Sequence, residues 1–218
     1  MFDCLRHVLQ ADLYRYRGQA NRRAFWSAYL HDPGFRFTYY LRKVQYYRES
    51  RNSWGMPGYV YNRLMLNYYR MRYGFDISPN TRIGPGLYLG HFSGVVISPY
   101  AILGSNINVA HGVTIGAESR GRRIGAPTLE DRVWVGPHAI IVGNITIGTE
   151  AMVGPGAYVN FDVPARAVVL GNPGKVVSYS GSSGYVNRTL DRFASRDIGS
   201  DQSRDKDNSN LAGVKGSV

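Results

Sequence analysis

The sequence predicts a mainly β fold: a parallel β-helix of about five coils, preceded by a small N-terminal α-helical subdomain and followed by a disordered C-terminal tail. Two observations predict the β-helix. Aliphatic residues recur at every sixth position, and a second sixfold column of small or aliphatic residues accompanies them. The first set comprises Ile77, Ile83, Leu89, Ile97, Leu103, Val109, Ile115, Leu129, Val135, Ile141, Ile147, Val153 and Val159, and the second comprises Val133, Ala139, Ile145, Ala151, Ala157 and Val163.

A period of six fits neither an α-helix nor the alternation of a simple strand. It is typical of a β-helix in which each hexad forms a short strand and a turn, and three hexads close one coil of about 18 residues. The period does not determine the handedness. Segment 117–126, AESRGRRIGA, interrupts the repeat as an Arg-rich loop. Loops that leave a solenoid often carry function.

The chain divides into an α-helical subdomain (1–75), the β-helix (76–177) and a flexible tail (178–218). Residues 1–75 contain thirteen Lys and Arg against four Asp and Glu, and so carry +9 of the total charge of +11. Their aromatic and basic residues predict one helix around 35–47 after the turn Asp32-Pro33-Gly34, and a second from Tyr59 to Arg72. Packing on the β-helix is the favoured role, with docking to an anionic membrane or a partner as the alternative. Nucleic-acid binding is disfavoured because no recognition motif accompanies the charge.

Composition restricts the location and the cofactors. The 218 residues contain a single cysteine, Cys4, so no intrachain disulfide or cysteine-ligated metal centre is expected. The chain has neither an apolar run of about 18 residues nor an apolar signal segment, which predicts a cytoplasmic protein. The basic N-terminal part leaves open a peripheral position at the inner face of the cell membrane.

Histidine is the first candidate for chemistry. His91 and His111 each follow an inward aliphatic residue by two positions, and they lie one coil apart in the repeat. Their rings should therefore stack on one face of the prism, whereas His138 occupies another position in its hexad and should point elsewhere. A three-histidine metal site would need a further ligand near His138, so we expect no metal.

Four segments resemble the serine acetyltransferase branch of the left-handed β-helix acyltransferases, a branch that includes many bacterial polysaccharide O-acetyltransferases. They are DISPNTRIGPGLYLGHFSGVVI, NINVAHGVTIG, PTLEDRVWVGPHAIIVGNITIG and GNPGK, and the resemblance spans about 76–177. It implies a left-handed prism, a homotrimer, and acetyl-CoA as co-substrate in the groove between adjacent subunits.

The resemblance also implies the catalytic residues. The family's basic histidine falls on His91 in Gly90-His91-Phe92-Ser93-Gly94, and its carboxylate partner falls on Asp76, fifteen residues upstream. A hydroxyl acceptor needs a base as it attacks a thioester, and imidazole is suited to that task near neutral pH. A carboxylate on the other ring nitrogen would fix the tautomer and stabilise the imidazolium.

The family's cofactor-binding positions fall on three pairs of neighbouring residues and on two basic side chains of this sequence. The pairs are Gly116 with Ala117, Gly136 with Pro137, and Gly154 with Pro155, whose main-chain amides could bond the pantetheine arm. The cations are Arg166 and Lys175, which could bind the phosphates.

Departures from the family predict the acceptor. The aspartate that contacts the serine amine is replaced by Gly90, and the arginine-histidine pair that holds serine falls on Gly125-Ala126. A serine zwitterion would lose charge-assisted hydrogen bonds that contribute about 1.5–3 kcal/mol each. We therefore expect a sugar hydroxyl of a surface polysaccharide or its precursor as acceptor. The basic N-terminal part would fit docking at an anionic membrane or to a polysaccharide-assembly complex. His111, Gly90, Arg122 and Arg123 are the expected acceptor-binding residues; L-serine is the alternative acceptor, and a non-catalytic β-helix scaffold the other alternative.

Overall fold

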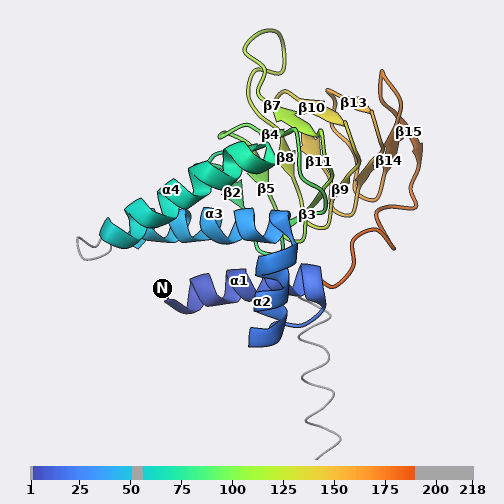
Figure 1. Cartoon of the computed structure of the whole chain (residues 1–218). Coiled ribbons are helices and arrows are strands. Elements are labelled where there is room, and N and C mark those ends of the chain that lie inside the picture. The colour runs from blue at the N-terminus through green and yellow to red at the C-terminus, as the bar shows by residue number, and fades with distance from the viewer. Residues whose placement is uncertain (1, 51–55, 190–218) are drawn as a thin grey trace, which may run out of the picture.

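The computed structural model describes residues 2–50 and 56–189 (Figure 1). Four helices come first, in the segment predicted to be an α-helical subdomain; the two helices predicted there correspond to the third and the fourth, and the first two were not predicted individually. The four helices are α1 (Phe2–Arg17), α2 (Arg22–His31), α3 (Pro33–Ser50) and α4 (Met56–Tyr73). The Asn21 side chain caps α2 by accepting a 2.9 Å hydrogen bond from the Ala24 N–H. Pro33 opens α3, where its fixed φ suits the first helical turn.

A parallel β-helix follows, with three sheets that form the faces of a prism (Figure 1). Sheet A contains β1 (Phe75–Ile77), β4 (Val95–Ile97), β7 (Thr114–Gly116), β10 (Ile140–Val142) and β13 (Tyr158–Val159). Sheet B contains β2 (Arg82–Ile83), β5 (Ile102–Leu103), β8 (Thr128–Leu129) and β11 (Thr146–Ile147). Sheet C contains β3 (Tyr88–Leu89), β6 (Asn108–Val109), β9 (Trp134–Val135), β12 (Met152–Val153), β14 (Val168–Leu170) and β15 (Lys175–Ser178).

The stacked aliphatic columns form the core of this prism. Parallel pairing aligns each hexad with the next coil, for example Ile77 with Ile97 and Leu89 with Val109. Every residue of both predicted columns is buried except Ile83, which is partly buried against the core. The period of six therefore predicted the mainly β fold and its number of coils.

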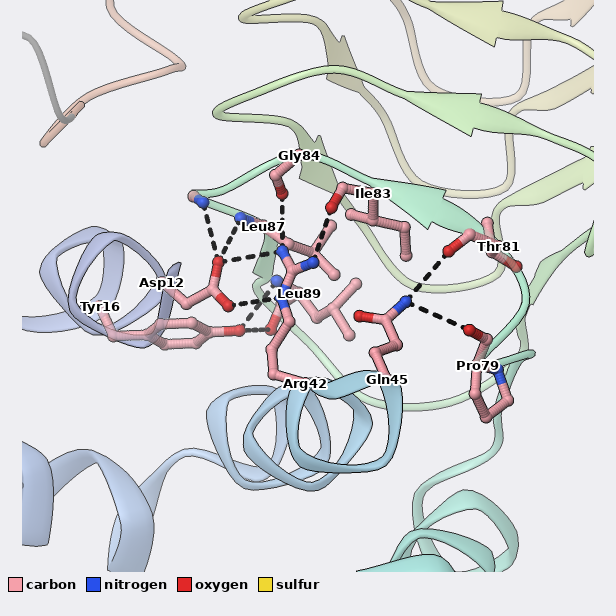
Figure 2. A network of polar contacts seen from close by, with 11 residues as sticks. Asp12, Tyr16, Arg42, Gln45, Pro79, Thr81, Ile83, Gly84, Leu87 and Leu89 are labelled. Atoms are coloured by element: carbon pink, nitrogen blue, oxygen red, sulfur yellow. Dashed lines mark hydrogen bonds and ion pairs between the residues drawn. The ribbon is translucent and has the colours of Figure 1, made fainter. Parts of the chain in front are cut away.

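The helices join the first coil through a buried polar network, drawn in Figure 2. Arg42 of α3 pairs with Asp12 of α1 at 2.9 Å, and Arg42 also donates to the carbonyls of Ile83 and Gly84. The other carboxylate oxygen of Asp12, Oδ1, accepts from the main-chain N–H groups of Gly86 and Leu87. These bonds fix α1 and α3 against the turn between β2 and β3.

The expected tail divides in two. Residues 190–218 lie outside the described residues. Residues 178–189, however, pack on the β-helix: Ser182 donates a 2.7 Å hydrogen bond to the Arg132 carbonyl, and Asn108 donates to the Tyr185 carbonyl. Arg188 also donates to the Tyr16 carbonyl of α1. Because these residues bond both parts of the molecule, the expected flexible tail beginning at 178 was wrong for this stretch.

Among the four helices that the structure describes, none is both long and apolar enough to cross a membrane.

Candidate active site

The turns that lead from sheet C into sheet A form one edge of the prism, here called the C–A edge (90–94, 110–113, 136–139 and 154–157). Three histidine rings form a column along it, with each ring edge to face with the next. The His91 and His111 ring centroids are 5.9 Å apart, and those of His111 and His138 are 5.0 Å apart. His91 and His111 lie next to each other on one face of the prism, as predicted, but their rings meet edge to face. The prediction that His138 points elsewhere was wrong.

The backbone explains why His138 joins the column. Pairing of Val109 with Val135 places His138 level with Gly112, one position beyond His111. A φ of 58° turns the His138 side chain back toward His111, and histidine is one of the residues enriched in this region. A Cβ on Gly112 would overlap the His138 ring, so glycine is needed there.

Exposure and bonding distinguish the three rings. His91 and His138 are exposed, whereas His111 is half-buried. The Nδ1 atom of His111 is buried, and among the described residues it has no hydrogen-bond partner. An unpartnered buried nitrogen is costly unless a ligand or water completes it, so this atom marks a polar contact point in the site.

The loop that carries His91 is held against the end of α4. Ser93 has a φ of 102°, a strained value for a residue with a Cβ, and such strain clusters at functional sites. A Cβ on Gly74 would lie 3.1 Å from the Gly94 nitrogen and 3.3 Å from the Ser93 Cα. Gly74 therefore allows the two backbones to approach closely.

Asp76 lies in β1, two residues after Gly74, with its side chain 56% exposed. It forms an ion pair with Arg70 of α4. In the part of the chain that the structure describes, no hydrogen bond or ion pair joins Asp76 to His91. The predicted catalytic pair, Asp76 and His91, is therefore not joined by a direct hydrogen bond or ion pair in this structure.

Two of the cofactor pairs lie on the C–A edge. Gly136 and Gly154 are stacked, because a Cβ on Gly136 would lie 2.9 Å from the Gly154 carbonyl carbon. Their amides, however, already donate to the carbonyls of Val153 and Val169 within the coils. With Pro137 and Pro155 they form a wall of the edge, and binding of a pantetheine arm to these two pairs stays a prediction. A side chain at Gly156 would project into open space, so the wall is accessible.

The remaining predicted residues lie elsewhere in the chain. Gly116 ends β7 and Ala117 begins the loop that projects beyond that strand in Figure 1, which also carries Arg122 and Arg123. Reciprocal hydrogen bonds between Glu118 and Gly125 close this loop. Arg166 lies on a third edge, between sheets B and C, and Lys175 begins β15. Within one subunit, the structure therefore does not bring Arg166 or the loop arginines to the histidines.

Sequence reasoning missed two contributors to this region. Because Pro137 occupies the position equivalent to His111, His138 seemed out of place, and only its left-handed backbone brings it into the column. Arg70 entered the prediction only as part of a basic segment. Its position six residues before Asp76, at the end of a helix that leads directly into β1, was the available signal. No group of three or more His, Cys, Asp or Glu side chains among the described residues could hold a metal ion.

Comparison with known proteins agrees with this architecture. Residues 126–160 match the bacterial transferase hexapeptide (six repeats) family. Serine acetyltransferase 2 of Arabidopsis thaliana is 34% identical over 173 residues, which are 79% of this chain and 51% of the relative. The serine acetyltransferase of Synechococcus elongatus is 36% identical over 149 residues, 68% of this chain and 59% of the relative. The chain thus spans about half the length of the curated relatives that it matches.

A solved structure extends the match to three dimensions. The serine acetyltransferase of Neisseria gonorrhoeae in complex with serine superimposes with a TM-score of 0.65 at 31% identity, covering 81% of this chain and 70% of that one. Helices and coils are thus shared, and the fold of this family is the left-handed β-helix. The chain therefore belongs to the hexapeptide-repeat acyltransferases, as a homologue of the serine acetyltransferases.

Proposed function

We propose that this chain is an acetyl-CoA-dependent O-acetyltransferase in which His91 is the general base. The observation that carries the proposal is the exposed imidazole of His91 on the same edge of the prism as the accessible wall of Gly136 and Gly154. A thioester lying along that wall would bring its carbonyl to the histidine column. The homology to serine acetyltransferases supports the same reaction class.

The residues suggest how the transfer proceeds. His91 removes the proton of the acceptor hydroxyl while the oxygen forms a bond to the thioester carbonyl carbon. The carbon–sulfur bond then breaks, and the imidazolium returns the proton to the departing thiolate of CoA. Once Asp76 breaks its ion pair with Arg70, it would bond to the His91 ring, orient that ring and stabilise its positive charge. The unpartnered Nδ1 of His111 is placed to bind a polar atom of the reactants.

A homotrimer completes this proposal. Gly116, Ala117, Arg122 and Arg123 lie on a different edge of the prism from His91. In a threefold assembly, an edge of one subunit faces another edge of its neighbour, so these residues can contribute to a groove that the single chain leaves open. Light scattering that finds a fully active monomer would refute the trimer.

Two acceptors are proposed in order. L-serine comes first, because the relatives at 31–36% identity are named serine acetyltransferases, and this favours it over the sugar preferred from the sequence. A sugar hydroxyl of a polysaccharide precursor comes second. Gly90, Gly125 and Ala126 carry no charge for a zwitterion, and this observation favours the larger and more neutral ligand.

The test is a thiol-release assay with acetyl-CoA and either L-serine or a panel of sugars and nucleotide sugars. We expect His91→Ala to lower kcat by about 10²–10⁴, the usual contribution of a general base, with little change in the KM for acetyl-CoA. His31→Ala is the matched control, because His31 is an exposed histidine on α2 that bonds only the Ser27 carbonyl among the contacts described. Turnover by His91→Ala close to that of the wild type would exclude the mechanism.

A further inference from the structure

The last turns of α4 and the start of β1 border an open cavity of about 610 Å³, and Asp76 is the predicted catalytic residue that lines it. Arg63, Asn67 and Arg70 line it from the helix, and Gly74 and Asp76 line it from the chain that follows. The three helical residues are spaced four and three positions apart, so they project from one face of α4. Three groups able to donate hydrogen bonds therefore converge on one space.

The charge of this cavity is positive. Two guanidinium groups face one carboxylate, and α4 itself contains no acidic residue. Arg70 pairs with Asp76, but both side chains are about half exposed, at 46% and 56%. Arg63 forms no hydrogen bond or ion pair with the rest of the described chain. Among the residues that line the cavity, two positive charges face one negative charge, and a ligand with a single negative charge would balance the difference.

The cavity adjoins the loop that carries His91. Gly74, which lines the cavity, accepts a 3.1 Å hydrogen bond from the Val95 N–H, directly after the loop. The rings of Tyr73 and Phe92 also lie 6.0 Å apart, so α4 touches the residue next to His91. A molecule whose anionic group occupied the cavity could therefore extend its hydroxyl toward the histidine column.

We propose that Arg63 and Arg70 bind a carboxylate of the acceptor, with Asn67 as an additional donor. The proposal rests on the acetyl-transfer function above and identifies its acceptor class as a hydroxyl-bearing monocarboxylate. Two forked guanidiniums suit a carboxylate, and they supply the positive charge that Gly125-Ala126 lack. Both an amino acid such as L-serine and a uronic acid have this chemistry.

Binding would also change the state of Asp76. The incoming carboxylate would compete with Asp76 for Arg70, and the exposed ion pair is weak enough to exchange partners. Asp76 would then be released toward His91. Occupation of the cavity would thus couple acceptor binding to orientation of the base.

The kinetic test compares Arg63→Gln and Arg70→Gln with Arg72→Gln, a matched control because Arg72 is exposed on the same helix but does not line the cavity. The acceptors are L-serine with L-serinamide, and D-glucuronate with D-glucose, so that each pair differs in its carboxylate. We expect the two cavity variants to raise the KM of the carboxylate acceptor at least about tenfold, the lower limit for a lost charge-assisted bond. The KM for acetyl-CoA should not change, and the pair that responds identifies the source of the carboxylate. An unchanged KM, or an equal loss for the neutral partner, would overturn the proposal.

A binding measurement separates this proposal from the catalytic one. Isothermal titration of L-serine and of D-glucuronate into the protein without acetyl-CoA should give binding that Arg63→Gln weakens and Arg72→Gln does not. If no acceptor is turned over but this pattern is found, the transferase function fails and the carboxylate site stands. If the wild type binds neither carboxylate, or Arg63→Gln binds as tightly as the wild type, the carboxylate site is refuted.

Discussion

Two Arg–Asp pairs in this molecule have the same chemistry and opposite surroundings. The pair between Asp12 and Arg42 joins two helices to the first coil, with side chains 0% and 4% exposed. The pair between Asp76 and Arg70 lies beside the candidate site, with side chains 56% and 46% exposed. In the first, main-chain N–H and carbonyl groups also bond the two side chains (Figure 2), whereas in the second about half of each side chain is exposed.

The difference shows how burial assigns a role to an ion pair. A buried charge without its partner is strongly destabilising, so the Asp12–Arg42 pair must stay intact in the folded protein. An exposed pair contributes about 0–1 kcal/mol and can open at little cost. The same residue types therefore serve as a fixed attachment in one region and as an exchangeable contact in the other.

The most severe test removes the buried carboxylate. We expect Asp12→Ala to lower the free energy of unfolding by about 3–5 kcal/mol, because Arg42 would remain buried without a counterion and two amides would lose their acceptor. Urea denaturation followed by circular dichroism measures this change. A loss below about 1 kcal/mol would mean that the network is no fixed attachment.

The matching substitution at the exposed pair should have a much smaller effect on stability. We expect Arg70→Gln to change the free energy of unfolding by no more than about 1 kcal/mol, in the same assay and buffer. Addition of 0.5 M NaCl should reduce even that difference, because salt screens exposed charges. If Arg70→Gln destabilised the protein as much as Asp12→Ala, the distinction between the two pairs would fail.

A third pair sharpens the comparison through its pH dependence. Asp162 lies 3.1 Å from Arg123 of the projecting loop and is 62% exposed. The hydrogen bond from the Thr146 N–H, followed by that from Arg123, lowers the pKa of the Asp162 carboxyl below its usual value. A lowered pKa means that the carboxylate stabilises the fold above the pKa of the unfolded state, and that this contribution is lost as the pH falls.

For this third pair we expect Asp162→Asn to be less stable than the wild type at pH 7, by less than about 1 kcal/mol given the exposure of the group. The difference should be constant well above pH 3.8, the usual value of the carboxyl, and should shrink as the pH falls below it toward the lowered pKa. Thermal unfolding at a series of pH values from 7 downward provides the measurement. A difference that stayed the same below pH 3.8 would show that the carboxylate charge is not its cause.

The coils could be predicted from the sequence because the same position in every hexad is aliphatic and points into the core. Ile77 and Ile97 are buried by the same local rule, so the repeat reveals inward positions without knowledge of the rest of the fold. The helical region has no such redundancy. Asp12 and Arg42 are thirty positions apart, and nothing in their local sequence distinguishes a buried pair from two surface charges.

The candidate site was predictable only where it follows the repeat. His91 and His111 occupy equivalent positions in successive coils, and their proximity follows from that register. His138 depends on one left-handed residue, and the cavity beside Asp76 depends on how α4 meets β1. Both are properties of tertiary geometry that the period of six does not encode.

The antiparallel strand β15 has a consequence for assembly. A parallel β-helix is in principle an endless stack, because the last coil presents the same kind of edge that the first coil can accept from another molecule. Here β15 pairs with β14 in the opposite direction, so the sheet C edge at that end no longer matches an incoming parallel coil. At the other end, α4 contacts β1 and α3 contacts β3. The chain thereby carries a terminator at each end of its stack, and these terminators oppose growth into fibres.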